Sequence, residues 1–296
     1  MTTPQLLRNA AICCTLSFGF IACQKDARNA DNQAMVMERE SSRKGGTAAM
    51  KQTMFYALTA SNEIIGYSSG NPLRETSATT LTGLSSGEKM LAIDFRPATG
   101  QLYGVSNNSR LYTINLTTGM VTPIAGSFMP AINGDAVGFD FNPTVDRIRL
   151  VTNTGQNLRL HPTTGMVAAA DGSIISSANV TAVAYTNSFA GATSTTLYDI
   201  DVASNQLFIQ TPPNNGTLVP VGSLGVQAVG EAGFDISPDN TVAIAALFGR
   251  GLEDDQMEES NGNKYRFYYI NLTTGEAKNA GKTERTIIGL AISPNQ

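Results

Sequence analysis

The chain has 296 residues, of which 42% are hydrophobic and only 15% are charged, and its formal net charge is −4. This length and hydrophobic content suffice for one or two domains with a sizeable core, whereas the acidic balance argues against a nucleic-acid binder, which needs a basic face. One His and three Cys leave few ways to build a zinc site, a Cys–His pair or a Ser–His–Asp triad.

The N-terminal segment has the pattern of an export signal. Arg8 precedes an apolar run that ends near Ala22, shorter than the roughly 20 residues of a membrane-spanning helix. The run ends in Phe20-Ile21-Ala22-Cys23, which resembles the lipobox of bacterial lipoproteins, with Phe20 where Leu is usual. The resemblance implies a signal peptide over residues 1–22 and a lipid on Cys23. An ordinary cleaved signal with incidental cysteines is the alternative.

Residues 23–51 are polar and of mixed charge, without a sustained apolar period, and we predict a flexible tether. Gln24 does not match the Asp that usually retains lipoproteins in the inner membrane, so the predicted location is the bacterial outer membrane, with the domain facing the periplasm or the cell surface. Cleavage before Cys23 would remove Cys13 and Cys14, which leaves the mature domain without a disulfide.

A seven-residue pattern recurs along the rest of the chain. Its copies are Leu91–Pro97, Val137–Pro143, Ala232–Pro238, Ile288–Pro294 and, in degenerate form, Thr181–Asn187. They start roughly 45–55 residues apart, which is the spacing of propeller blades. Between the copies lie short alternating runs separated by Gly and Asn turns, which predicts four strands per repeat. The runs after the first copy are residues 101–105, 110–114 and 120–124.

The two ends of the array are permuted. It opens with strands two to four of a repeat, at residues 54–58, 63–67 and 76–80, and it closes with strand one, at residues 286–293. A last strand that completes the first blade would close a ring and remove its open edges. We therefore predict an all-β, five-bladed β-propeller with four-stranded blades over residues 52–296, its first blade closed by the C-terminal strand. An open β-array or a sandwich is the alternative.

Part of the pattern points to a family. The run from Gly138 to Pro143, followed by Arg149-Leu150-Val151-Thr152, resembles the Gly-Phe-Asp-x-Asn-Pro and Arg-Leu-Val-Thr pattern of a bacterial family catalogued as domain of unknown function 4394. Gly233-Phe234-Asp235 matches in part, and the resemblance covers about residues 50–294. It implies an extracytoplasmic propeller-like domain and brings no catalytic residues with it.

Asp94, Asp140 and Asp235 share one position of strand one. Because strand one is the innermost strand of a blade, their carboxylates would approach the axis, and two carboxyls about 5–10 Å apart would suit glycoside hydrolysis. A hydrolase of glycans or lactones is therefore the alternative function. The favoured interpretation is structural, since a residue repeated with the blade commonly caps backbone N–H groups, although Ala184 and Ala291 break the series.

Two clusters of charged residues, one acidic and one basic, are predicted to lie at the surface without binding a ligand. The segment 251–263 carries five acids but lacks the alternating pattern of a calcium loop, so we predict a solvated insertion and no metal site. Arg147, Arg149 and Arg159 are predicted to lie on neighbouring strands and to pair with Asp146 or with solvent. A bidentate grip on a carboxylate or phosphate is the alternative for these arginines.

The predicted protein is thus a lipid-anchored cell-envelope propeller without a cofactor, acting as a non-catalytic ligand-binding or protein-interaction module. Its predicted partners are the membrane, through lipidated Cys23, and an envelope ligand or protein; nucleic acid is not among them. The missing nucleophile–base set and the regular repeat favour binding over catalysis.

Overall fold

The structure, a computed structural model, describes residues 52–251 and 264–294. The predicted signal peptide, Cys23, the tether and the body of the acidic insertion lie outside the described residues. Within the described ranges, no helix has the length and apolar character needed to cross a membrane.

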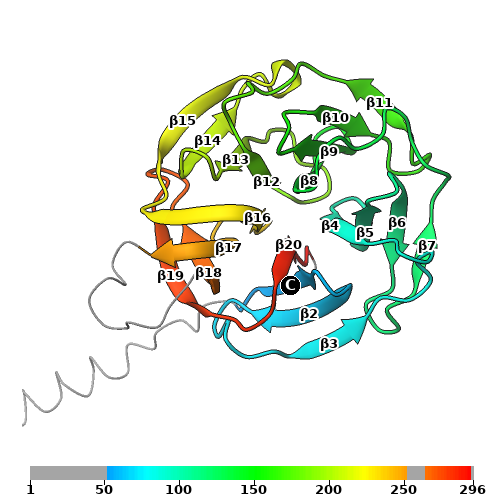
Figure 1. The fold of residues 1–296 in the computed structure, drawn as a ribbon, viewed down its shortest axis with the longest axis horizontal. Coiled ribbons are helices and arrows are strands. Elements are labelled where there is room, and N and C mark those ends of the chain that lie inside the picture. The colour runs from blue at the N-terminus through cyan, green and yellow to red at the C-terminus, as the bar shows by residue number, and fades with distance from the viewer. Residues whose placement is uncertain (1–51, 252–263, 295–296) are drawn as a thin grey trace, which may run out of the picture. The chain divides into compact units, whose positions relative to one another are not determined.

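The described chain forms five four-stranded antiparallel sheets that stand as blades around an axis (Figure 1), which confirms the predicted five-bladed propeller. Blade 1 consists of β20 (Ile287–Ile292), β1 (Met54–Thr59), β2 (Glu63–Ser68) and β3 (Ser77–Thr80). Blade 2 consists of β4 (Met90–Arg96), β5 (Gln101–Ser106), β6 (Leu111–Ile114) and β7 (Val121–Pro123). Blade 3 consists of β8 (Val137–Asn142), β9 (Arg147–Thr152), β10 (Asn157–Leu160) and β11 (Val167–Ala170).

Blade 4 consists of β12 (Val180–Tyr185), β13 (Leu197–Asp201), β14 (Gln206–Gln210) and β15 (Leu218–Ser223), with a single 3-10 turn, η1 (Pro213–Asn215), between its last two strands. Blade 5 consists of β16 (Val226–Ile236), β17 (Ala243–Gly251), β18 (Lys264–Ile270) and β19 (Ala277–Lys282). The first strand of each of blades 2 to 5 is its innermost, and β20 fills that place in blade 1 (Figure 1).

Blade 1 closes the ring as predicted. Strand β1 pairs with β2 on one side and with β20 on the other, so that Tyr56 lies opposite both Gly66 and Ala291. The chain before β20 is also tied to blade 1, because Arg285 forms ion pairs with Glu75 at 2.9 Å and Glu63 at 3.3 Å. Joining the two ends of the described chain in one sheet leaves the ring without an open blade.

The hydrophobic core lies between the faces of neighbouring blades. Alternating residues of one strand face opposite blades, as the period of a strand requires. One buried cluster, for example, combines Val105 and Leu111 of blade 2 with Phe139 and Leu150 of blade 3. The rings of Tyr103 and Phe141 meet edge to face across this boundary, with centroids 5.1 Å apart.

The five inner strands approach one another closely at the axis. A Cβ atom on Gly138 would lie 2.9 Å from the backbone nitrogen of Val183, and one on Gly233 would lie 2.7 Å from that of Leu290. The glycines two residues before Asp140 and Asp235 are therefore required by strand contact, whereas Ala92 takes this place before Asp94. The axial cavity between the strands measures about 10 Å³, about the volume that one water centre needs.

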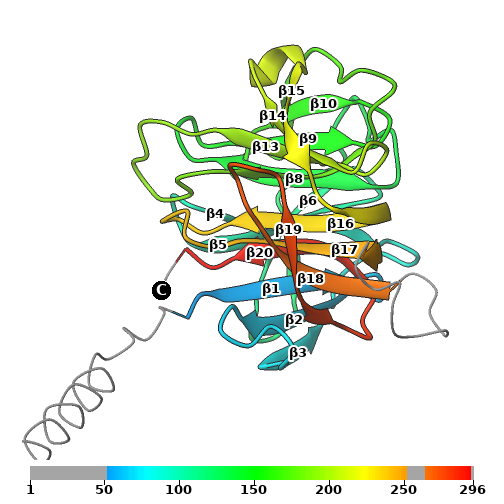
Figure 2. The ribbon, with the colours of Figure 1, turned by 90° about the vertical axis from the view of Figure 1, so that its left-hand side faces the viewer.

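Blade 5 departs from the predicted pattern at its inner hairpin. The sequence pattern places the start of its first strand near Ala232, whereas β16 begins at Val226 and pairs with a nine-residue β17. A bulge between Ala228 and Ala232, with Gly230 at φ 71°, breaks the alternation there. Figure 2 shows this hairpin from the side; its extension carries residues to one mouth of the ring.

Candidate functional site

The three predicted aspartates meet near the axis. Asp94 lies on β4, Asp140 on β8 and Asp235 on β16, and all three side chains are buried. One carboxylate oxygen from each lies within 4.8 Å of the others. The three aspartates that share one position of the repeat thus lie close together in the structure.

Each of the three carboxylates accepts a hydrogen bond from the inner strand of the next blade. Asp94 accepts the N–H of Phe141 at 2.8 Å, and Asp140 accepts that of Tyr185 at 3.2 Å. Asp235 likewise accepts the N–H of Ile292 on the strand that closes the ring. The carboxyls therefore link successive blades at the otherwise unpaired inner edges.

The two alanines in the series fit the same scheme. Ala184 in blade 4 has no carboxylate to offer to the inner strand of blade 5, and that strand carries Asp235. In the same way, Ala291 in blade 1 has none to offer to the inner strand of blade 2, which carries Asp94. Each of these aspartates uses its second oxygen to accept the N–H that follows it in the chain, at 2.6 Å in both cases. The inner-strand N–H groups that gain a carboxylate partner are those of Phe95, Phe141, Tyr185, Ile236 and Ile292.

Asp140 gives only one oxygen to the backbone, and its carboxyl also hydrogen-bonds that of Asp235. Burial raises the pKa of Asp94 and Asp140 well above the usual range, and the neighbouring aspartate charges raise both further. Burial raises the pKa of Asp235 to about 7. Two carboxyls can share a hydrogen bond only if one retains a proton, so the cluster is held partly protonated near neutral pH.

This arrangement withholds the carboxyls from solvent. The axial cavity beside them has room for about one water, and it is lined by the inner-strand residues that precede the three aspartates and the equivalent Ala184 and Ala291. A metal ion would have to compete with the backbone N–H groups for the same oxygens. The geometry thus matches the favoured structural interpretation of the aspartates.

A larger pocket, the mouth pocket, lies where the inner strands of blades 3 and 4 begin, beside the bulge of β16 in blade 5. It has a volume of about 300 Å³. Its lining residues are Asp135, Ala136, Asn153, Asn179, Thr181, Gly230, Glu231, Phe248 and Tyr265. The extended hairpin of blade 5 supplies Gly230, Glu231 and Phe248, so the pocket depends on the part of β16 that the repeat pattern did not predict.

Two residues that line the mouth pocket each have a buried side-chain oxygen without a hydrogen-bond partner among the described residues. These oxygens are Asn179 Oδ1 and Thr181 Oγ1. The same pocket is lined by Phe248 and Tyr265, whose rings pack at a centroid distance of 4.8 Å. Burial and the charge of Asp135 raise the pKa of Glu231. The pocket therefore combines an aromatic surface with several acceptors whose bonding capacity is unused.

For Arg149 and Arg159, the expected pairing with Asp146 or solvent was wrong. Asp146 instead pairs with Arg96 of blade 2, whose guanidinium holds the pKa of the Asp146 carboxyl below its usual value. Arg149 and Arg159 both pair with Asp171, a residue of the loop after β11 that the sequence analysis did not consider. The prediction failed because Asp146 turns toward the preceding blade, whereas Asp171 faces the arginine side chains of its own blade.

The single histidine has a local role. His161 opens a tight turn that ends at Gly165, and its Nδ1 lies 3.3 Å from the backbone nitrogen of Thr163. Asn115 occupies the same position in blade 2, where its Oδ1 accepts the N–H of Thr117. His161 thus replaces the asparagine of the repeated turn.

A family model described as "Domain of unknown function (DUF4394)" matches residues 63–291. The chain is also similar to the protein in a crystal structure of a protein of unknown function from Bacteroides caccae, determined at 1.35 Å resolution. The two are 11% identical with a TM-score of 0.46, over 82% of this chain and 99% of that one. No curated protein matches the chain.

Proposed function

The chain belongs to the family described as domain of unknown function (DUF4394), and we propose that its propeller is a non-catalytic module that binds a hydroxyl-rich ligand in the mouth pocket. The pair of unpartnered oxygens, Asn179 Oδ1 and Thr181 Oγ1, carries the proposal. A buried polar atom without a partner costs about 1–3 kcal/mol, so two of them in one pocket are expected to pair with bound hydroxyl groups.

The rest of the pocket fits the chemistry of a sugar. A sugar ring has an apolar face of C–H groups and a rim of hydroxyls, which match the rings of Phe248 and Tyr265 and the carboxyls of Asp135 and Glu231. The volume of about 300 Å³ lies at the lower end of the roughly 300–1,000 Å³ of small-molecule sites. A ligand of one or two sugar rings is the size class that fits.

The alternative function is hydrolysis of a glycan or lactone by Asp94, Asp140 and Asp235. In its favour, the pKa of Asp235 is raised to about 7, a value that suits a general acid at neutral pH. Against it, the carboxyls bind backbone N–H groups and lie beside a cavity of about 10 Å³. A sugar cannot reach them without opening the ring, which favours binding over hydrolysis.

The proposed setting is the bacterial cell envelope. We propose that cleavage after residue 22 leaves Cys23 as a lipid anchor in the outer membrane, with residues 23–51 as the tether, on the lipobox-like Phe20–Cys23. Mass spectrometry of the protein from its native membrane tests this: an acylated N-terminal Cys23 is the expected result, and an unmodified later start contradicts it.

Calorimetric titration of the purified protein against a panel of mono- and disaccharides tests the proposed function. We expect heat of binding with at least one neutral sugar, about tenfold or greater loss of affinity in Thr181→Val, and an intact sugar afterwards. Thr80→Val is the matched control, because Thr80 is exposed on β3 of blade 1. Turnover that disappears in Asp140→Asn, or no binding by the wild type, contradicts the proposal.

A further inference from the structure

A second pocket, the arginine pocket, lies at the opposite ends of the inner strands, between blades 3 and 4. Its volume is about 200 Å³. The residues lining it are Asn142, Val145, Arg147, Arg149, Arg159, Tyr185, Pro213 and Asn214. Asn142 ends β8 and Tyr185 ends β12, whereas the mouth pocket is formed where these strands begin. The two pockets therefore belong to different mouths of the ring.

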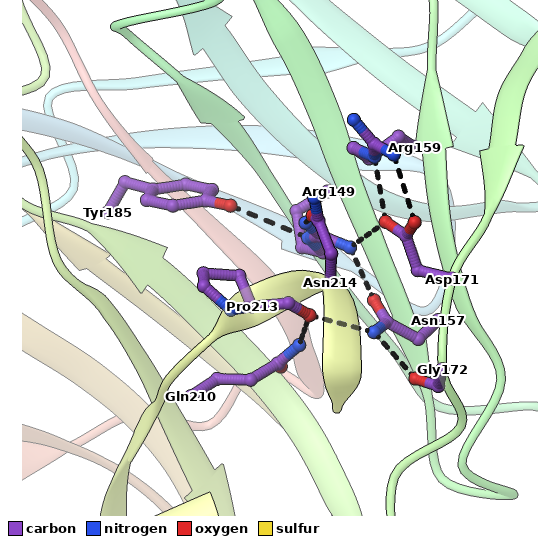
Figure 3. Close-up of polar contacts among 9 residues, drawn as sticks. All are labelled: Arg149, Asn157, Arg159, Asp171, Gly172, Tyr185, Gln210, Pro213 and Asn214. Atoms are coloured by element: carbon purple, nitrogen blue, oxygen red, sulfur yellow. Dashed lines mark hydrogen bonds and ion pairs between the residues drawn. The ribbon is translucent and has the colours of Figure 1, made fainter. Parts of the chain in front are cut away.

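Arg149 is fixed at the base of this pocket (Figure 3). Its side chain is 2% exposed. Its Nη1 donates to Asn157 at 2.6 Å and to Asp171 at 2.8 Å, and its Nη2 donates to Asn214 at 2.8 Å. Its Nε lies 3.4 Å from the hydroxyl of Tyr185. Four of its five N–H groups thus have partners within the described part of the chain, and one on Nη2 remains for a ligand.

The turn that carries Asn214 is held in place by blade 3 (Figure 3). Asn157 donates to the carbonyl oxygens of Pro213 at 3.0 Å and Gly172 at 2.9 Å, and Gln210 donates to the same Pro213 oxygen. These bonds tie η1 of blade 4 to the arginine cluster of blade 3. The pocket is consequently preorganised, which reduces the entropic cost of binding.

The other two arginines keep unused donors. Arg159 binds Asp171 through Nε at 2.7 Å and Nη2 at 3.0 Å, which leaves its Nη1 group without a partner among the described residues. Arg147 donates through Nη1 to the backbone carbonyls of Val145 and Asp146 and has no other hydrogen-bond partner among the residues that the structure describes. Both side chains line the pocket, so their remaining N–H groups are available at its wall.

The charges around the pocket do not balance. Three guanidinium groups face one carboxylate, that of Asp171, since Asp146 is engaged by Arg96 of blade 2. Asp199 is completely buried in the neighbouring blade, where burial raises its pKa well above the usual range and the charge of Arg149 lowers it. Even with Asp199 counted as ionised, three guanidinium groups against the carboxylates of Asp171 and Asp199 leave the cluster with an excess of positive charge.

We propose that the arginine pocket binds the oxyanion group of a small ligand, a carboxylate or a phosphate, between Arg147, Arg149 and Arg159. The planar guanidinium groups present paired N–H donors that match either oxyanion, and burial at the base strengthens the attraction. A volume of about 200 Å³, below the roughly 300 Å³ of drug-sized sites, limits the ligand to about one sugar acid or sugar phosphate.

Calorimetry at constant ionic strength tests the proposal, with sodium glucuronate and inorganic phosphate as the two ligands. The uncharged control is glucose titrated into Thr181→Val, in which sugar binding at the mouth pocket is weakened. We expect binding of at least one anion, with affinity reduced about tenfold to a hundredfold in Arg147→Gln. Arg147→Lys should restore only part of it, because lysine lacks the planar fork. Arg147 is the informative position, since only backbone carbonyls hold it.

Two further variants separate the possible outcomes. Arg74→Gln removes one positive charge from an exposed site in blade 1 and should leave anion binding unchanged. Thr181→Val alters the mouth pocket and should also leave it unchanged, so this proposal and the proposed function fail independently. Absence of binding by both anions, or equal loss in Arg74→Gln and Arg147→Gln, overturns the assignment. Glucuronate alone identifies a carboxylate ligand, and phosphate alone identifies a phosphate ligand.

Discussion

The carboxylate of Asp94 on blade 2 accepts the backbone N–H of Phe141 on blade 3 at 2.8 Å. The same carboxylate accepts the N–H of Phe95 with its other oxygen. One side chain thus satisfies two inner-strand amides that face the axis, where no further strand can pair with them. Asp140 and Asp235 make the same contact with the next blade, so the stability of the ring should depend on these carboxylates.

The three ring aspartates should differ in their contribution to stability. Asp94 and Asp235 each satisfy two backbone N–H groups, whereas Asp140 satisfies one. Each buried donor left unpaired costs about 1–3 kcal/mol, so Asp94→Ala and Asp235→Ala should lower the free energy of unfolding more than Asp140→Ala does. Urea unfolding measures this order, and an equal or reversed order would show that the amide contacts do not determine stability.

Stability should fall as pH rises. The unfolded state releases the Asp235 proton near the usual pKa of about 4, whereas the folded state retains it up to about 7. The folded state therefore binds more protons between about pH 4 and pH 7, and the free energy of unfolding decreases across that window. Urea unfolding at pH 5 and pH 8 should give a lower midpoint at pH 8.

Asp140→Asn is the matched variant for this titration. The amide oxygen can still accept the N–H of Tyr185, and the amide N–H can donate to Asp235, as the protonated acid does. The variant should be close to the wild type at pH 5 and more stable than the wild type at pH 8. An identical pH dependence in the two proteins would rule out the shared proton as its source.

Two axial glycines should respond differently to substitution. A Cβ on Gly233 would lie 2.7 Å from backbone atoms of Gly289 and Leu290, whereas a Cβ on Gly289 would have its nearest neighbour at 3.5 Å. Gly233→Ala should therefore lower the free energy of unfolding by about 1–3 kcal/mol, with Gly289→Ala close to neutral. Thermal unfolding of both variants checks the inner-strand spacing; similar melting temperatures would argue against it.

Thr181→Val should separate stability from binding. The hydroxyl of Thr181 is buried without a partner among the described residues, so its replacement by a methyl group of similar shape should leave the free energy of unfolding unchanged or raise it by up to about 1 kcal/mol. The same variant should bind sugars more weakly. A clear loss of stability would mean that the hydroxyl serves the fold, and the mouth pocket would lose its principal support.

The ring could be predicted from sequence because its elements repeat. The copies of the Asp pattern mark the inner strands, and the permuted ends at Met54 and Ile292 indicate how the first blade closes. The meeting of Asp94, Asp140 and Asp235 follows from their shared position in those strands. Because the same strand pattern recurs in each blade, recognising it in a few copies is enough to predict the architecture of the whole ring.

The mouth pocket lies where the repetition breaks. Thr181 belongs to the degenerate copy, and Glu231 lies in the bulge at which β16 loses its alternation. The arginine pocket depends on partners outside the repeated strands, because Arg149 binds Asp171 in the loop after β11 and Asn214 in η1. The hydrogen-bond partners of a side chain such as Thr181 can come from loops that are distant in the sequence. The spacing of the repeat does not predict where those loops lie.

The most direct test of the binding account is a crystal structure of the protein with the neutral sugar that binds best in calorimetry. We predict an intact sugar in the mouth pocket, with hydroxyl groups within hydrogen-bonding distance of Asn179 Oδ1 and Thr181 Oγ1 and a ring packed against Phe248 or Tyr265. A sugar bound against Asp94, Asp140 and Asp235, or found cleaved, would contradict the account and support hydrolysis at the axis.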